Sequence, residues 1–193
     1  MLFRLGPPPN SLSDAELASG EWRRLPRPPL WAIHLLSLPI GAVLALIVFV
    51  GWARFAPRFN ISFEPGYQVA AAFLVVVTAG VLLQIVTHPG MGFTENSVLG
   101  LWPSRLTPYT AHLSKATKYR QVAASVLPFL VLALLPLALA SVTRISSGWL
   151  VFGSCLSAAI FGVNVILVVP VLRLPRGSVL AGRGFEAYWK LAR

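Results

Sequence analysis

The sequence predicts an all-α membrane protein, a bundle of about four transmembrane helices with a cytoplasmic loop rich in glycine and proline. The first observation behind this prediction is composition: 56% of the residues are hydrophobic and 11% are charged, against about 45–50% and roughly 25% in soluble domains. The second is a mean hydropathy of +0.72. The third is that the apolar residues gather in four long runs. So little polar surface cannot coat a globule, and lipid is therefore the expected solvent.

Residues 1–29 form a polar, proline-rich N-terminal segment. Pro7–Pro9 and the prolines between 26 and 29 prevent a long helix, because proline cannot continue one. Ser13 to Glu16 (Ser-Asp-Ala-Glu) is the only stretch here that favours a helical turn, with serine as the N-cap and glutamate three residues later.

A four-helix transmembrane domain is expected over residues 30–172. Its spans are placed at about 30–50, 69–87, 122–142 and 149–172, each close to the roughly 20 residues that cross the hydrocarbon core. Aromatic side chains mark the ends of the runs, where they prefer the interface: Trp31, Trp52, Tyr67 and Trp149. Prolines predict kinks: Pro39, Pro128, Pro136 and Pro170.

Two segments outside the spans have their own character. The loop from His88 to Gln121 is rich in glycine, proline and aromatic residues and is expected to be interfacial, with room for a small hairpin. Residues 173–193 form a basic, aromatic C-terminal tail that is expected to lie on the lipid headgroups.

The distribution of positive charge predicts the orientation. Of sixteen Lys and Arg residues, all except Arg54, Arg58 and Arg144 lie in the N-terminal segment, the middle loop and the tail. The positive-inside rule then places both termini and that loop in the cytoplasm. The formal net charge of +10 flanks apolar runs without forming one dense patch, which indicates anionic lipid as the partner and argues against nucleic acid.

Few residues could carry chemistry. None of the six acidic residues falls inside a span, so a proton pump or carboxylate ion path lacks its parts. The lone Cys155 cannot build a thiolate zinc site. The stretch Gln84-Ile85-Val86-Thr87-His88 invites comparison with H-E-x-x-H, in which two histidines bind zinc and glutamate acts as the base. Only the second histidine is present, and on spacing alone His88 is an interfacial residue more readily than a ligand.

The sequence around this motif resembles the zincin-type peptidase family of bacterial membrane proteins, which is similar to the site-2 proteases. The resemblance is carried by the helix ending at His88-Pro89-Gly90-Met91-Gly92, the loop from Ser97 to Arg105, the basic stretch Lys118-Tyr119-Arg120, and the Pro128 helix that follows. The tail from Leu174 to Trp189 continues it. The resemblance implies a multi-pass protein of the bacterial cytoplasmic (inner) membrane.

Carried over residue by residue, the family's first ligand falls on Gln84, its base on Ile85 and its second ligand on His88. The acidic third ligand expected on the last helix has only Asn164 nearby. Amide oxygens are poor zinc ligands beside imidazole, and isoleucine cannot act as a base. The resemblance therefore implies a pseudo-peptidase with no catalytic residue, and zinc would be the cofactor only if the family chemistry survived.

Three functions stay open at this stage. The first is a non-catalytic protein that binds another membrane protein or a peptide. The second is a zinc-dependent intramembrane metallopeptidase with atypical ligands, borrowing His112 from the loop. The third is a lipid-binding accessory subunit, indicated by the basic loop and the aromatic tail.

Overall fold

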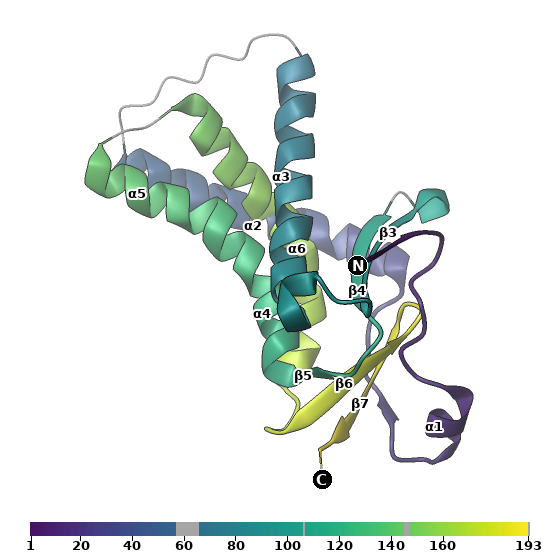
Figure 1. The fold of residues 1–193 in the computed structure, drawn as a ribbon. Helices are drawn as coiled ribbons and strands as arrows, with labels where there is room; N and C mark the ends of the chain where they lie inside the picture. Colours follow the sequence, from purple (N-terminus) through teal and green to yellow (C-terminus); the bar gives the residue numbers. More distant parts are fainter. Residues whose placement is uncertain (57–65, 106, 145–146, 193) are drawn as a thin grey trace. The chain divides into compact units, whose positions relative to one another are not determined.

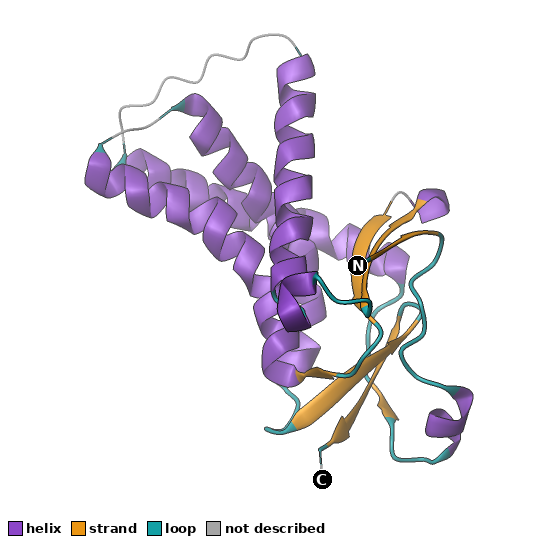
Figure 2. Ribbon diagram, in the orientation of Figure 1, coloured by secondary structure: helices purple, strands orange, loops and turns teal. Residues whose placement is uncertain are grey.

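The computed structural model describes residues 1–56, 66–105, 107–144 and 147–192, and it contains four helices long and apolar enough to cross a membrane (Figures 1 and 2). These are Leu30–Phe55, Val69–Val86, Lys118–Thr143 and Gly148–Leu172. The prediction of four apolar helices, and with it a multi-pass membrane protein, fits this result. The prediction of an all-α fold is wrong, because two β-sheets accompany the helices. Arg58 and Arg193, which enter the charge count, lie outside the described residues.

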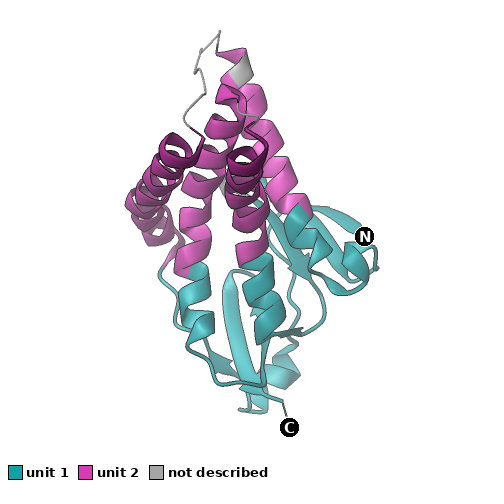
Figure 3. Cartoon of the chain, turned by 90° about the vertical axis from the view of Figure 1, so that its left-hand side faces the viewer, with its two compact units in different colours: residues 1–28, 83–125, 167–193 teal, residues 29–82, 126–166 magenta. Residues whose placement is uncertain are grey.

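The chain divides into two compact units (Figure 3). Unit 1 comprises residues 1–28, 83–125 and 167–193, and unit 2 comprises residues 29–82 and 126–166. Unit 1 holds all the strands, and unit 2 holds most of the apolar helical residues.

Unit 2 is built from α2 (Leu30–Phe55), most of α3 (Tyr67–Val86), part of α4 (Lys118–Phe129), α5 (Leu135–Thr143) and most of α6 (Gly148–Leu172). Its buried core surrounds Trp52 and includes residues of α2, α5 and α6: Val48, Ala140, Val151 and Ala158. Many apolar side chains of these helices are exposed, as expected of helices that cross a membrane.

Helices α2 and α6 approach closely within unit 2. A Cβ on Gly41 would lie 2.3 Å from the carbonyl oxygen of Ala159, and one on Gly162 would lie 2.6 Å from that of Ser37. Both glycines are therefore required by backbone contact, as is common where helices pack in lipid.

The third span is irregular where its prolines predict. Between Pro128 and Pro136 the helix widens into a π-helical turn, Leu130–Leu134, before α5 resumes. Proline removes a backbone donor and crowds the preceding turn, and a π-turn absorbs such a defect.

Unit 1 contains the first sheet, with strand order β1-β3-β4. Strands β3 (Ser97–Trp102) and β4 (Thr107–His112) are antiparallel, which fulfils the expected hairpin in the middle loop. Strand β1 (Leu2–Leu5) pairs with β3 in parallel. The N-terminal segment therefore supplies a strand that its prolines gave no reason to expect.

The second sheet has the order β2-β7-β6-β5, and the C-terminal tail forms a hairpin within it that was not predicted from the sequence. Strands β6 (Ser178–Arg183) and β7 (Glu186–Leu191) turn at Gly184, whose φ of 58° suits a two-residue hairpin loop. Strand β2 (Arg23–Arg24) adds to β7, and β5 (Ala116–Thr117) adds to β6. Alternation along β6 and β7 is the signal that could have predicted them.

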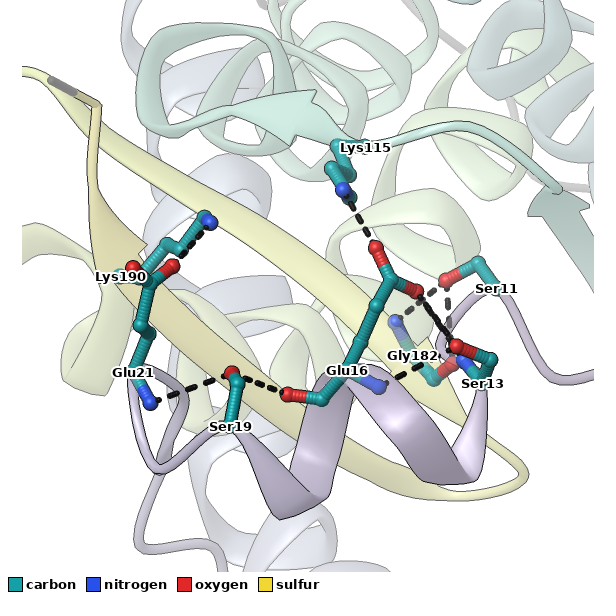
Figure 4. A network of polar contacts seen from close by, with 8 residues as sticks. All are labelled: Ser11, Ser13, Glu16, Ser19, Glu21, Lys115, Gly182 and Lys190. Atoms are coloured by element: carbon teal, nitrogen blue, oxygen red, sulfur yellow. Dashed lines mark hydrogen bonds and ion pairs between the residues drawn. The ribbon is translucent and has the colours of Figure 1, made fainter.

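The N-terminal strap, residues 11–25, fastens to this second sheet (Figure 4). Helix α1 (Asp14–Ala18) begins with the predicted capping box of Ser13 and Glu16. Ser11 exchanges hydrogen bonds with the backbone of Gly182. Among the described residues, four partly exposed ion pairs link segments of unit 1: Arg24–Glu186, Lys115–Glu16, Arg183–Asp14 and Lys190–Glu21.

Candidate functional site

The candidate site lies where α3 ends, in unit 1. The helix ends at Val86, and the Thr87 hydroxyl donates back to the carbonyl oxygen of Gln84 at 2.6 Å. His88 has left the helix, with φ −71° and ψ 156°. Pro89 explains the position of this end, because the residue before a proline avoids helical geometry. In H-E-x-x-H both histidines project from one helical face, so this exit already departs from that arrangement.

A tight turn follows the helix and packs on Ile85. Gly90, Met91 and Gly92 all have positive φ, between 53° and 81°. A Cβ on Gly92 would lie 2.0 Å from a methyl carbon of Ile85. Ile85 is only 6% exposed. Position 85, to which the resemblance assigns the base, therefore holds a buried apolar side chain with a structural partner.

Strand β4 brings two side chains to the end of α3. The Thr110 hydroxyl donates to the side-chain oxygen of Gln84 at 3.2 Å. The rings of His88 and His112 meet edge to face, with centroids 5.4 Å apart. Since alternate residues of a strand share one face, Thr110 and His112 pair in turn with Gln84 and His88. The structure thus brings together Gln84, Ile85, His88 and the His112 that the metallopeptidase alternative borrows.

The hydrogen bonds of His112 define its tautomer. The backbone N–H of Ser114 donates to His112 Nδ1 at 3.1 Å, so the neutral ring carries its proton on Nε2. This Nε2 is buried without a hydrogen-bond partner among the described residues, and so is His88 Nδ1. The pair therefore offers a buried donor beside a second ring nitrogen.

Both rings are held neutral. Burial, followed by the charges of His112 and Arg120, lowers the pKa of His88 to about 4. Burial also lowers the pKa of His112, and Arg120 acts in the same direction. At neutral pH the site is an uncharged imidazole pair near one cation.

These residues do not fit a catalytic zinc centre. A zinc-bound histidine usually donates its other ring N–H to an acceptor, whereas His112 Nδ1 accepts from a backbone N–H. The oxygen of Gln84 is committed to Thr110, and the positive charge of Arg120 disfavours a second cation. Among the described residues no three His, Cys, Asp or Glu side chains gather in a group that could hold a metal.

Asn164, the fourth position assigned by the resemblance, lies on α6 in unit 2, whereas Gln84, Ile85 and His88 lie in unit 1. Sequence reasoning missed Thr110 and Ser114, the partners that fix Gln84 and His112. For Thr110, the alternation of β4 is the signal that could have found it.

Comparison with family models, with curated proteins and with solved structures gives no match to this chain.

Proposed function

We propose that this chain is a non-catalytic multi-pass membrane protein, a pseudo-peptidase that acts by binding a partner polypeptide. One observation carries the proposal. At the two positions that the resemblance assigns to the first ligand and the base, Gln84 is hydrogen-bonded to Thr110 and Ile85 is buried against Gly92. Both positions are filled by structural contacts, and hydrolysis needs a base that isoleucine cannot supply.

The test uses the full chain in lipid nanodiscs. Zinc content is measured by elemental analysis, and peptide release is measured with and without a chelator. The expected result is less than one equivalent of zinc, unchanged by His88→Ala, and no chelator-sensitive cleavage. One equivalent of zinc that is lost with His88→Ala, together with chelator-sensitive cleavage, contradicts the proposal.

Matched variants test the zincin-like plan itself. Gln84→His returns a second histidine, and Gln84→His with Ile85→Glu restores the complete motif. We expect zinc uptake by at least one of them, because a histidine at position 84 would add a third imidazole to the group that contains His88 and His112. If neither variant takes up zinc while both keep the helicity of the parent chain, the pseudo-peptidase assignment is wrong.

A second candidate function, binding of anionic lipid, is favoured by Arg27. This residue lies three positions before Leu30, the first residue of α2. Its Nε is buried without a hydrogen-bond partner among the described residues, and burial lowers the pKa of its guanidinium. Arg27 takes part in none of the four ion pairs described in unit 1. A phosphate group would satisfy this cation, since buried charges require partners.

Native mass spectrometry of the full chain with phosphatidylglycerol or phosphatidylcholine tests this second candidate. We expect preferential retention of the anionic lipid, reduced several-fold by Arg27→Gln and left unchanged by the exposed control Arg176→Gln. Equal retention of the two lipids, or equal effects of the two variants, contradicts it.

The proposed location is a bacterial cytoplasmic membrane with both termini on the cytoplasmic side, supported by the distribution of Lys and Arg. A reporter that fluoresces only in the cytoplasm, fused to the C-terminus, is expected to be bright. A dark fusion of normal abundance contradicts this orientation.

A further inference from the structure

The edge of β3 that faces away from β4 is paired with β1, a strand at the N-terminus. Leu2 to Leu5 of β1 pair in parallel with Val98 to Leu101 of β3. The pairing continues past the strand, where the backbone N–H of Gly6 donates to the carbonyl oxygen of Leu101 at 2.9 Å. Without β1 the backbone groups on this edge of β3 would lack their strand partner.

The side chains of β1 contribute little to this attachment. All four residues of the strand are exposed, with Phe3 at 70% and Leu5 at 66%. The contact is therefore made mainly by backbone hydrogen bonds, which any extended polypeptide can supply. Parallel pairing is also somewhat weaker per residue than antiparallel pairing.

The Tyr109 side chain of the hairpin contacts the segment that follows β1. Gly100 of β3 has no side chain, and a Cβ there would lie 2.1 Å from the ring of Tyr109. The Tyr109 ring therefore lies across β3 from β4. Its hydroxyl reaches the carbonyl oxygen of Pro7, just beyond β1, at 3.2 Å. This hydrogen bond also recognises only backbone.

The segment that follows β1 can donate few backbone hydrogen bonds to the sheet. Pro7, Pro8 and Pro9 have no backbone N–H to donate. The next fixed point is Ser11, whose backbone N–H donates to Gly182 and whose hydroxyl accepts from the N–H of Gly182. Release of β1 would thus leave the strap and the second sheet attached.

We propose that the edge of β3 is a strand-accepting site that β1 fills in cis, and that an extended, apolar segment of a partner polypeptide docks there by displacing β1. The inference rests on the proposed polypeptide-binding function and names the class of partner. The partner strand would run parallel to β3. Alternate apolar residues of that strand would lie beside Leu99 and Leu101, as Phe3 and Leu5 do.

The test removes the strand and returns it as a peptide. The chain lacking residues 2–6 is reconstituted in nanodiscs and titrated with a fluorescently labelled peptide of residues 1–8 (MLFRLGPP), with fluorescence anisotropy as the readout. We expect saturable binding to the shortened chain and at least tenfold weaker binding to the full chain. A control peptide with Phe3→Pro and Arg4→Pro should not bind, because one of these two N–H groups faces β3.

Two further variants test the Tyr109 contact and the occupancy of the edge. Tyr109→Phe in the shortened chain should weaken peptide binding several-fold, since it removes only the hydroxyl. Leu5→Cys with Leu101→Cys, in a Cys155→Ser background, should lock β1 when oxidised. The locked full chain should reject the peptide, and reduction should raise its binding.

Three outcomes overturn the inference. The first is no binding by the shortened chain while hydrogen exchange shows its β3–β4 hairpin intact. The second is equal binding of the two peptides. The third is a full chain that is dimeric through exchanged β1 strands, which would assign the edge to a second copy. The zinc measurements do not involve β1, so failure here is distinguishable from failure of the proposed function.

Discussion

The hydroxyl of Thr110 on β4 donates a hydrogen bond to the side-chain oxygen of Gln84 at the end of α3, with 3.2 Å between the two oxygens. This bond joins two residues 26 positions apart, and it occupies the atom that a zinc ligand at position 84 would use. Breaking it with Thr110→Val leaves the Gln84 oxygen without this donor. We expect a loss of about 1 kcal/mol in local stability.

Hydrogen exchange of the β4 amides checks this expectation, with Ser104→Ala as the exposed control. Gln84→Leu should cost a similar amount. The double variant should cost less than the sum, because the two changes remove the same bond. Strictly additive effects would show that the bond contributes nothing.

The neutral histidine pair predicts a loss of stability in mild acid. The pKa of His88 is about 4 in the folded chain, against the usual histidine value of 6.5, which applies to the unfolded chain. Above pH 6.5 both states are neutral and the histidine has no effect. Between pH 6.5 and about 4 only the unfolded state gains a proton, so stability falls as the pH falls.

Thermal midpoints in nanodiscs at pH 7.5 and pH 5 measure this effect. Because His88 is half-buried, solvent screening leaves on the order of 1 kcal/mol, or about 2–4 °C. His88→Gln should reduce the acid-induced shift by this amount. An unchanged shift in His88→Gln would exclude this histidine as its source. His112 and Arg120 face the ring and remain in every variant.

The strap predicts a titration well below the usual range. Lys115, followed by the backbone N–H of Ser13, lowers the pKa of Glu16 to about 2. The contribution of the Glu16–Lys115 ion pair to the attachment of the strap is therefore complete above pH 4.5 and is lost as the pH falls toward 2. Lys115→Gln should move the carboxyl titration of Glu16 back toward 4.5, observed by carboxyl NMR. Lys118→Gln, which leaves the Glu16 ion pair intact, is the control.

The contact between α2 and α6 predicts which glycines are essential. Gly41→Ala would place a Cβ against the carbonyl oxygen of Ala159, and overpacking of this kind costs about 1–3 kcal/mol or more. We expect a lower thermal midpoint in nanodiscs. Gly80→Ala is the matched control, since its nearest neighbours would be side-chain carbons at 4.0 Å. Equal midpoints for the two variants would mean that α2 and α6 can separate without cost.

Local patterns predicted several elements because their causes are local. Ser13 and Glu16 form the capping box within a single turn. The prolines at 128 and 136 border the π-turn, and Pro89 ends the helix before His88. The pairing of β6 with β7 in the tail was not predicted, because aromatic and basic residues suit both a membrane surface and a hairpin. The expected contact of the tail with lipid headgroups stays a prediction.

By itself, the sequence determined the four apolar helices, their approximate limits and the presence of Ile85 where H-E-x-x-H has glutamate, because length, hydropathy and residue identity are properties of single segments. The tertiary structure decided which side chains meet. It brought His112 to His88 and Thr110 to Gln84. It also brought β1, at the N-terminus, to the edge of β3 in the middle of the chain. Backbone pairing and side-chain contacts between distant segments depend on the three-dimensional path of the chain, which no local pattern encodes.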